Sequence, residues 1–199
     1  MRLVNCLSLI ERFKKKWKNG IPTVNFGGIN KRVGKLLRPM KDNPIKKNKS
    51  HLTAIVRRTL PVPTRWLIKA GLVDVEKNVL DFGCGKCGEV NPKTWDNYDP
   101  FYRPWSCWHK RTYQTIICNY VLCTLCEKDR LPILKEIQKK LSGKNAIAYI
   151  SVRNDKPKNG WGKSNKGTYQ GRVRNLNLPL VYKNSQFRIY HLTKETVLL

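Results

Sequence analysis

The stretch that decides the fold is Asn78 to Gly88, which reads NVLDFGCGKCG. Val79 and Leu80 begin a short apolar run typical of a buried strand, and Asp81 closes it. Three glycines follow at G-x-G-x-x-G spacing: Gly83, Gly85 and Gly88. Glycines at this spacing let the backbone turn sharply after a strand and let a ligand approach the main chain closely. The spacing alone is a weak signal, so its context decides what it means.

That context includes a second acidic residue, Asp99, in the sequence NYDP. Asp99 lies where a second strand would end, and a carboxylate there can accept both hydroxyls of a ribose. A helix-like segment precedes the glycine stretch. The pattern therefore predicts a pocket for a nucleoside-bearing cofactor.

VLDFGCGKCG resembles the first motif of class I S-adenosylmethionine-dependent methyltransferases, and NYDP resembles the acid of their second strand. Three later segments resemble the fourth strand, the following helix and the fifth strand of that family: YQTIICNYVLCTL, DRLPILKEIQKKL and NAIAYISVRND. The resemblance covers residues 55–153, about half of the chain. It implies S-adenosylmethionine as the cofactor.

A narrower similarity is to the methyltransferases associated with DNA phosphorothioation. In that family an Arg-rich lead-in similar to RRTLPVPTRWLIKAGL precedes the glycine motif, and an element similar to DPFYRP follows it.

The fold implied by this resemblance and by the apolar runs is an α/β fold with a Rossmann-like open sheet. The sheet is mostly parallel and ends in an antiparallel hairpin. We expect strands at residues 78–81, 114–118 and 145–152, helices at 65–71 and 129–141, and the hairpin at 180–183 and 187–193. Thr64 is expected to cap the first helix, and the helix should turn Trp66, Leu67 and Ala70 toward the sheet. Too few residues lie between Pro100 and Tyr113 for the usual helix–strand–helix, so the third strand should be absent or vestigial.

The first 50 residues differ from the rest in pattern. Their apolar residues recur at helical spacing and predict an amphipathic helix: Leu3, Leu7, Ile10, Phe13 and Trp17. A Gly-, Asn- and Lys-rich segment then extends to residue 50. We therefore divide the chain into a basic N-terminal helix and arm, residues 1–50, and a methyltransferase-like domain, residues 51–199.

The formal charge of the chain is +27, from 40 Lys and Arg against 13 Asp and Glu. Residues 1–50 carry a balance of +12, whereas residues 51–100, which contain the glycine motif, carry +1. A field of this sign attracts polyanions, so we expect a nucleic acid, RNA or DNA, as a partner.

A basic segment with interleaved aromatic residues follows the predicted fifth strand, from Arg153 to Arg174. Basic side chains for phosphates and aromatic faces for bases are the components of single-strand binding, and the glycines of this segment suit a lid. The residues that we expect to bind substrate are Lys156, Lys158, Trp161, Lys163, Lys166 and Tyr169. A solvated surface loop is the alternative interpretation.

The resemblance implies a role for each motif residue. Gly83 and Gly85 would give the methionine moiety access to the backbone, Asp81 would orient the loop or the amino group of the cofactor, and Asp99 would hold the ribose. Asn119 and Tyr120 lie where acceptor and methyl would meet, and they are the predicted catalytic residues. The full cofactor set is Asp81, Phe82, Gly83, Cys84, Gly85, Asp99, Pro100 and Asn119. Strand-end capping is the alternative role for Asp81 and Asn119.

The Asn/Asp-Pro-Pro-aromatic motif expected for methylation of exocyclic base amines is missing, because Asn119 is followed by Tyr120, Val121 and Leu122. This counts against a standard DNA amino-methyltransferase, and leaves RNA, protein and small-molecule acceptors open.

Three alternatives remain. The glycine spacing also fits a nicotinamide-dependent oxidoreductase, and the scaffold could serve a non-catalytic nucleic-acid-binding protein. Two C-x-x-C pairs, Cys84/Cys87 and Cys123/Cys126, could hold zinc through four thiolates. The first pair lies in the cofactor loop and the second in an apolar run, where free cysteine packs as a small hydrophobe, so we predict no metal.

Seven cysteines, an odd number scattered through the motif strands, indicate reduced thiols and predict a cytoplasmic setting, that of the host if the protein is viral. No apolar run approaches the ~18 residues of a membrane span. We also expect no secretory signal.

Overall fold

The computed structural model describes residues 50–86, 90–104, 111–155, 161–163, 168–171, 173 and 175–198. The predicted N-terminal helix lies outside these residues, as do nearly all of the arm and Lys156, Lys158 and Lys166. The division of the chain near residue 50 stays a prediction.

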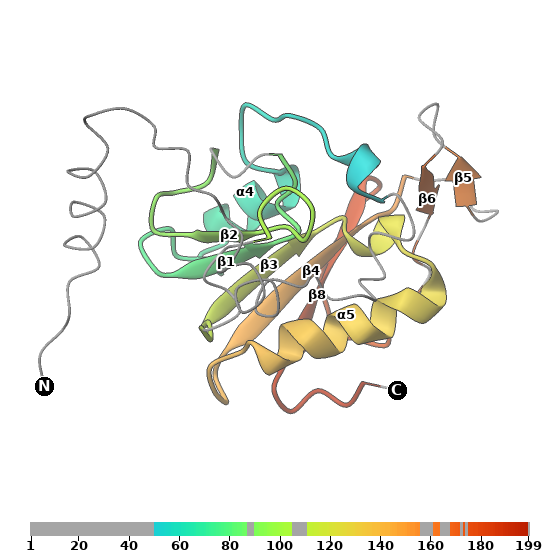
Figure 1. Ribbon diagram of the computed structural model, residues 1–199. Coiled ribbons are helices and arrows are strands. Elements are labelled where there is room, and N and C mark those ends of the chain that lie inside the picture. The colour runs from blue at the N-terminus through green and yellow to red at the C-terminus, as the bar shows by residue number, and fades with distance from the viewer. Residues whose placement is uncertain are drawn as a thin grey trace, which may run out of the picture. The chain divides into compact units, whose positions relative to one another are not determined.

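A six-stranded sheet forms the centre of the described fold, in the order β2-β1-β3-β4-β8-β7 (Figure 1). Its strands are β1 (Val79–Phe82), β2 (Asp96–Tyr98), β3 (Thr115–Asn119), β4 (Ile147–Arg153), β7 (Leu180–Lys183) and β8 (Phe187–Thr193). The pairs β1–β2, β1–β3 and β3–β4 are parallel, whereas β8 runs antiparallel to both of its neighbours. The predicted open, mostly parallel sheet with an antiparallel C-terminal hairpin is therefore confirmed.

Strands β1 and β3 are neighbours inside the sheet, and both are largely buried on both faces. Leu80 pairs with Ile116 and Asp81 with Ile117 in the parallel register. No strand in the described part of the chain pairs with the outer edge of β2. Within the described residues, which leave out 105–110, the sheet is thus reduced around the third strand as expected.

The core lies in two layers because side chains alternate between the faces of each strand. Leu80 and Phe82 belong to the larger core cluster, which also contains Ile133, Leu134 and Ile137 of helix α5 (Glu127–Lys139). Val79 faces the other way, toward the cluster that contains Leu67 of helix α4 (Val62–Lys69). Helices thus cover both faces, as buried parallel strands require.

Both helices begin earlier in the chain than the sequence suggests. Helix α4 starts at Val62 rather than Arg65, because Pro63 lies in its first turn, where a backbone N–H has no helical partner to lose. Thr64 is therefore inside the helix, and its predicted capping role is wrong. Leu67 is buried and Trp66 partly buried, but Ala70 is exposed, contrary to expectation.

Helix α5 begins at Glu127, two residues before the predicted start, and ends at Lys139. Acidic residues in its first turn and a lysine in its last turn suit the helix dipole. None of the helices in the part of the chain that the structure describes is long and apolar enough to cross a membrane.

Four smaller elements surround the carboxyl ends of the parallel strands. The 3₁₀ helix η1 (Ser50–Thr53) precedes α4, and η4 (Leu122–Thr124) follows β3. The short strands β5 (Trp161–Lys163) and β6 (Tyr169–Gly171) pair antiparallel in a separate sheet beyond β4. Thr168 and Val173, on either side of β6, are buried, so part of the predicted lid is packed against the domain.

Candidate cofactor-binding site

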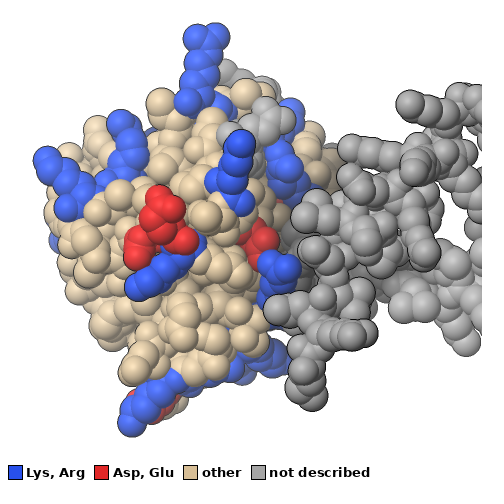
Figure 2. All heavy atoms as spheres, turned by 90° about the vertical axis from the view of Figure 1, so that its left-hand side faces the viewer, with Lys and Arg blue, Asp and Glu red and all other residues tan. Residues whose placement is uncertain are grey.

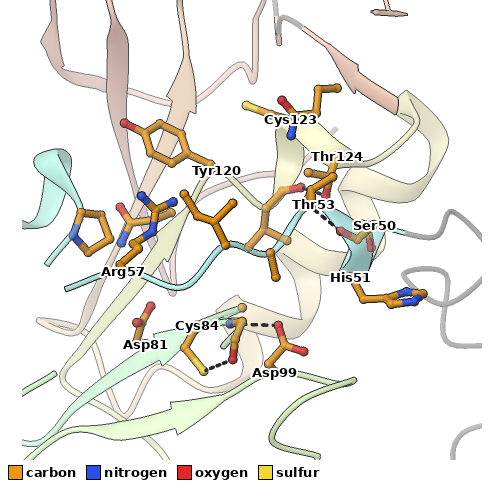
Figure 3. Close-up of a pocket in the computed structure, with 18 of the residues that line it drawn as sticks. Ser50, His51, Thr53, Arg57, Asp81, Cys84, Asp99, Tyr120, Cys123 and Thr124 are labelled. Atoms are coloured by element: carbon orange, nitrogen blue, oxygen red, sulfur yellow. Dashed lines mark hydrogen bonds between the residues drawn. The ribbon is translucent and has the colours of Figure 1, made fainter. Parts of the chain in front are cut away.

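A cavity of about 210 Å³ lies at the carboxyl ends of β1, β2 and β3. Its lining includes seven of the eight predicted cofactor residues, together with the predicted catalytic Tyr120: Asp81, Gly83, Cys84, Gly85, Asp99, Pro100 and Asn119. In Figure 3, Asp81, Cys84 and Asp99 lie on one side of this pocket and Tyr120, Cys123 and Thr124 on the other. The residues that the sequence singled out therefore lie around one cavity. Their binding roles remain predictions.

Phe82 is the exception among these residues. Its side chain is fully buried and packs against Tyr98 in the core cluster beneath the pocket, with ring centroids 5.3 Å apart. Phe82 therefore supports the strand that carries the glycine loop, and it does not line the cavity.

The turn after β1 depends on two glycines with positive φ, Gly83 at +76° and Gly85 at +63°. A Cβ on Gly83 would lie 2.3 Å from Cγ2 of Val121, so both the backbone angle and the space require glycine there. The amides of Gly83 and Cys84 both donate to the carbonyl of Tyr98, at 2.7 and 3.1 Å. The loop is thus fixed to the end of β2.

Asp99 closes the same loop from the other side. Its Oδ2 accepts the amide of Gly85 at 3.1 Å, and its Oδ1 accepts the amides of Phe101 and Tyr102 at 2.8 and 2.9 Å. A carboxylate has about four acceptor positions, so three of those on Asp99 are already used by the main chain. Asp99 is therefore a structural clamp as well as a candidate ribose ligand.

Asp81 is a buried carboxyl at the end of β1, with 7% of the residue exposed. Burial raises its pKa from the ordinary value of 3.8 to about 6, although a hydrogen bond from Asn91 and the charge of Arg57 act in the opposite direction. Nδ2 of Asn91 donates to Oδ2 of Asp81 at 2.7 Å and also to Oδ1 of Asn97 on β2. The carboxyl is thus oriented by Asn91, and its charge is sensitive to any cation that enters the pocket.

Asn119 has both ends of its amide occupied. Its Nδ2 donates to Oγ1 of Thr64 on α4 at 2.8 Å, and its Oδ1 accepts from Oγ of Ser151 on β4 at 2.8 Å. The predicted catalytic amide is therefore held between two neighbouring elements. This arrangement favours a positioning role for the side chain.

Tyr120 follows Asn119 with a φ of +62°, which is uncommon for a residue other than glycine. Its amide donates to the carbonyl of Ser151 at 2.9 Å, and this bond holds the turn against β4. Burial raises the pKa of Tyr120 to about 12. At neutral pH its phenol therefore stays protonated and can donate a hydrogen bond.

The pocket lining also includes Cys123, Thr124, Arg153 and Gln170. Sγ of Cys123 accepts the amide of Arg153 at 3.1 Å, and burial raises the pKa of this thiol to about 11. The guanidinium of Arg153 forms a two-point ion pair with Asp155.

None of the four described cysteines is in a disulfide bond: Cys84, Cys118, Cys123 and Cys126. Among the described residues no group of three or more His, Cys, Asp or Glu side chains could hold a metal ion. Cys87, which would belong to one of the C-x-x-C pairs, lies outside the described residues.

The segment Ser50–Arg57 supplies a part of the pocket that sequence reasoning missed. Its lining residues are Ser50, His51, Thr53, Ala54, Ile55 and Arg57. No motif marks them, although Arg57 belongs to the Arg-rich lead-in RRTL. Asn91, the partner of Asp81, was also missed because it lies in an irregular loop with no recognisable spacing.

The predicted substrate residues are only partly placed. Trp161 and Lys163 lie in β5 and Tyr169 in β6, and the structure describes the backbone but not the side chains of these three residues. Gln170 of β6 lines the pocket, so this segment does reach its rim.

No protein-family model and no curated protein matches the chain. Among solved structures, a complex of DhpI with SAH has a TM-score of 0.42 and 7% identity, and the match covers 65% of this chain and 86% of that one. The SAH-bound magnesium protoporphyrin IX methyltransferase ChlM from Synechocystis PCC 6803 has a TM-score of 0.37 and 13% identity, over 92% and 93% of the two chains. Both TM-scores lie below 0.5, so neither similarity is evidence about function.

Proposed function

We propose that this protein is an S-adenosylmethionine-dependent methyltransferase. The observation that carries the proposal is the arrangement of Asp81 and Asp99 at the ends of adjacent parallel strands, on either side of two positive-φ glycines that open onto one cavity. Open α/β sheets bind ligands at this edge. Asp81 suits the cationic amino end of the cofactor, and Asp99 suits its ribose.

The hydrogen bonds of Asp99 support a narrower form of the ribose-binding role that we propose for it. Because three main-chain amides already occupy its carboxylate, we expect it to accept one ribose hydroxyl rather than both. S-adenosylmethionine supplies a methyl group that is already activated by the sulfonium, so the protein needs mainly to position the acceptor. Asn119, fixed by Thr64 and Ser151, and Tyr120, whose phenol can donate, are the residues to which we assign this positioning.

Isothermal calorimetry with S-adenosylhomocysteine, S-adenosylmethionine and NAD⁺ tests the proposal. We expect the first two to bind with one site per chain and NAD⁺ not to bind. Asp99→Ala should weaken binding by about 1.5–3 kcal/mol, because it removes a hydrogen bond to a charged acceptor and loosens the glycine loop.

A suitable control is Asp74→Ala. The exposed Asp74 accepts the amide of Glu76 at 3.0 Å in a comparable turn, and it is not among the residues that line the pocket. It should leave binding unchanged. Binding of NAD⁺ without S-adenosylhomocysteine would instead identify a nicotinamide-dependent oxidoreductase.

We further propose that the methyl acceptor is a nucleic acid or a molecule bound to one. The charge of +27 supports this, as does the basic segment after β4, which reaches the pocket rim at Gln170. The similarity of RRTLPVPTRWLIKAGL and DPFYRP to methyltransferases associated with DNA phosphorothioation favours DNA as one acceptor to test. In this structure those two segments contribute Arg57, Pro61, Asp99 and Pro100 to the pocket lining.

A further inference from the structure

The cavity is smaller than a usual site for the nucleoside cofactor that we propose. Sites for drug-sized ligands and cofactors enclose about 300–1,000 Å³, whereas this cavity encloses about 210 Å³. Six of the lining residues belong to the segment Ser50–Arg57, which crosses between the two walls of the pocket in Figure 3. Part of the ligand space is therefore taken by the chain itself.

His51 lines the pocket, and its ring stacks on an aromatic residue that follows Asp99 closely in the chain. It stacks on Phe101 with centroids 3.7 Å apart and an angle of 10° between the planes. Phe101 is 44% exposed, and its amide is bound to Asp99, the candidate ribose ligand. A flat aromatic ring on this face of Phe101, beside Asp99, occupies the position that a purine joined to the ribose would take.

The rest of the segment also covers cofactor features. Ala54 lies on the glycine loop, because a Cβ added to Gly85 would be 3.2 Å from that of Ala54. Arg57 places a cation in the field of Asp81, and its charge acts to lower the pKa of that carboxyl. The segment thus places the ring of His51 on Phe101, next to Asp99, which we assign to the base-ribose end of the cofactor. It also places the cation of Arg57 near Asp81, which we assign to the amino end.

A hydrogen bond from Tyr102 holds the segment, and two features favour its displacement. The hydroxyl of Tyr102 donates to the carbonyl of His51 at 2.9 Å. Ile55 and Val56 are 53% and 76% exposed, so moving them outward exposes little further apolar surface. Nδ1 of His51 is buried and has no hydrogen-bond partner among the described residues. This missing hydrogen bond costs free energy while the segment covers the pocket.

We infer that residues 50–57 form a strap that competes with the cofactor for its own site, with the His51 ring as the internal stand-in for the adenine. Cofactor entry exchanges the His51–Phe101 stack for a stack of the purine on Phe101. The inference rests on the proposed function, because it takes an adenine nucleoside as the ligand.

Calorimetry with S-adenosylhomocysteine on the full chain provides the test. Tyr102→Phe removes the hydroxyl that holds the strap but is not in the pocket lining, so it should raise the affinity about 2- to 10-fold. His51→Ala should also raise the affinity.

In the His51→Ala background, Phe101→Ala should lower the affinity at least about 5-fold, because the base loses its stacking partner. Tyr182→Phe, on a ring that stacks with Trp66 instead, is the matched control and should have no effect.

Hydrogen exchange gives an independent measurement. The amide of Ala54 donates to the carbonyl of His51 at 3.1 Å within the strap, and it should exchange faster after S-adenosylhomocysteine is added. If the wild type binds S-adenosylhomocysteine and both single variants bind it equally or more weakly, His51 is part of the site and the strap inference is wrong. If the wild type and both variants all fail to bind, the proposed function itself is overturned.

Discussion

A charged Asp81 opposes folding, because its carboxyl is buried and its pKa is raised to about 6. The folded state binds the proton more tightly than the unfolded chain does. The stability that this group contributes is therefore fully present below about pH 4 and is lost as the pH rises through about 6. We expect Asp81→Asn to raise the free energy of unfolding by up to about 3 kcal/mol at pH 8 and by little at pH 4.

The asparagine keeps an oxygen that can accept the amide of Asn91, so the main change is the loss of charge. Urea unfolding at the two pH values measures the effect. An equal gain at pH 4 and pH 8 would mean that the charge is not the cause. The same variant should bind S-adenosylhomocysteine more weakly, which would explain why a destabilising charge is kept.

Three glycines allow the effect of backbone strain on stability to be measured separately from that of steric crowding. Gly143 has neither a positive φ nor a neighbour within 4 Å of an added Cβ, Gly71 has a φ of +69° in open space, and Gly83 has both the positive φ and the contact with Val121. Changing each to alanine should therefore leave stability nearly unchanged at Gly143, cost about 1–2 kcal/mol at Gly71, and cost more at Gly83.

Denaturant unfolding of the three variants gives the order. Gly83→Ala should also abolish cofactor binding, since the loop must move away from Val121. Equal losses at Gly71 and Gly83 would show that the loop yields easily and that the contact with Val121 does not matter.

At the scale of elements, the amide of Asn119 joins α4, β3 and β4 through Thr64 and Ser151. Removing either partner leaves part of a half-buried amide without its hydrogen bond. We expect Thr64→Val and Ser151→Ala each to lower the free energy of unfolding by about 1–3 kcal/mol. The double variant should lose less than the sum, because both act on one side chain.

Asn175→Ala is the control, since Asn175 and Asn177 form an exposed pair of amides and the loss should be small. Methyl transfer and cofactor affinity should be measured in the same variants. If Asn119 positions the acceptor, turnover should fall more than cofactor affinity does. Strict additivity in the double variant would contradict a shared network.

The elements that the sequence predicts well are those whose signal is local. Continuous apolar runs marked β3 and β4, and the hairpin predicted at 180–183 and 187–193 matches the observed bounds of β7 and β8. The start of α4 was misplaced because Pro63 reads as a helix breaker, although in the first turn it is harmless.

The pocket was predicted only where strand ends carry a motif, as at Asp81, Gly83 and Asp99. His51 reaches it from the short helix η1, and Asn91 and Arg57 reach it from irregular segments, so only the folded chain brings these residues together. The hydrogen bonds from main-chain amides to Asp99 could not be predicted either. Backbone amides occur in almost every residue, so no sequence pattern marks these partners.

On the scale of the whole molecule, basic residues are unevenly distributed. Twenty of the 40 Lys and Arg lie outside the described residues, chiefly in residues 1–49. Figure 2 shows one face, on which basic side chains are spread out with acidic ones between them. The described residues on this face therefore present no continuous basic patch, and the polyanion surface stays a prediction for the N-terminal arm and the segment after β4.

The salt dependence of nucleic-acid binding tests that surface. Each phosphate contact should add about 0.7–0.9 to the slope of log affinity against log salt concentration. Changing Lys156, Lys158, Lys163 and Lys166 to Gln should therefore flatten the slope by up to about 3.6 and leave binding of S-adenosylhomocysteine intact. Fluorescence anisotropy with RNA and DNA oligonucleotides between ~50 and ~200 mM salt provides the measurement.

The matched control changes Lys69, Lys77, Lys139 and Lys194 to Gln, since these described lysines lie outside the segment after β4 and do not line the pocket. An equal flattening in both variants would show that binding follows net charge and no particular surface. Negligible affinity of the wild type at ~50 mM salt would exclude the polyanion and direct the search for the acceptor to proteins and small molecules.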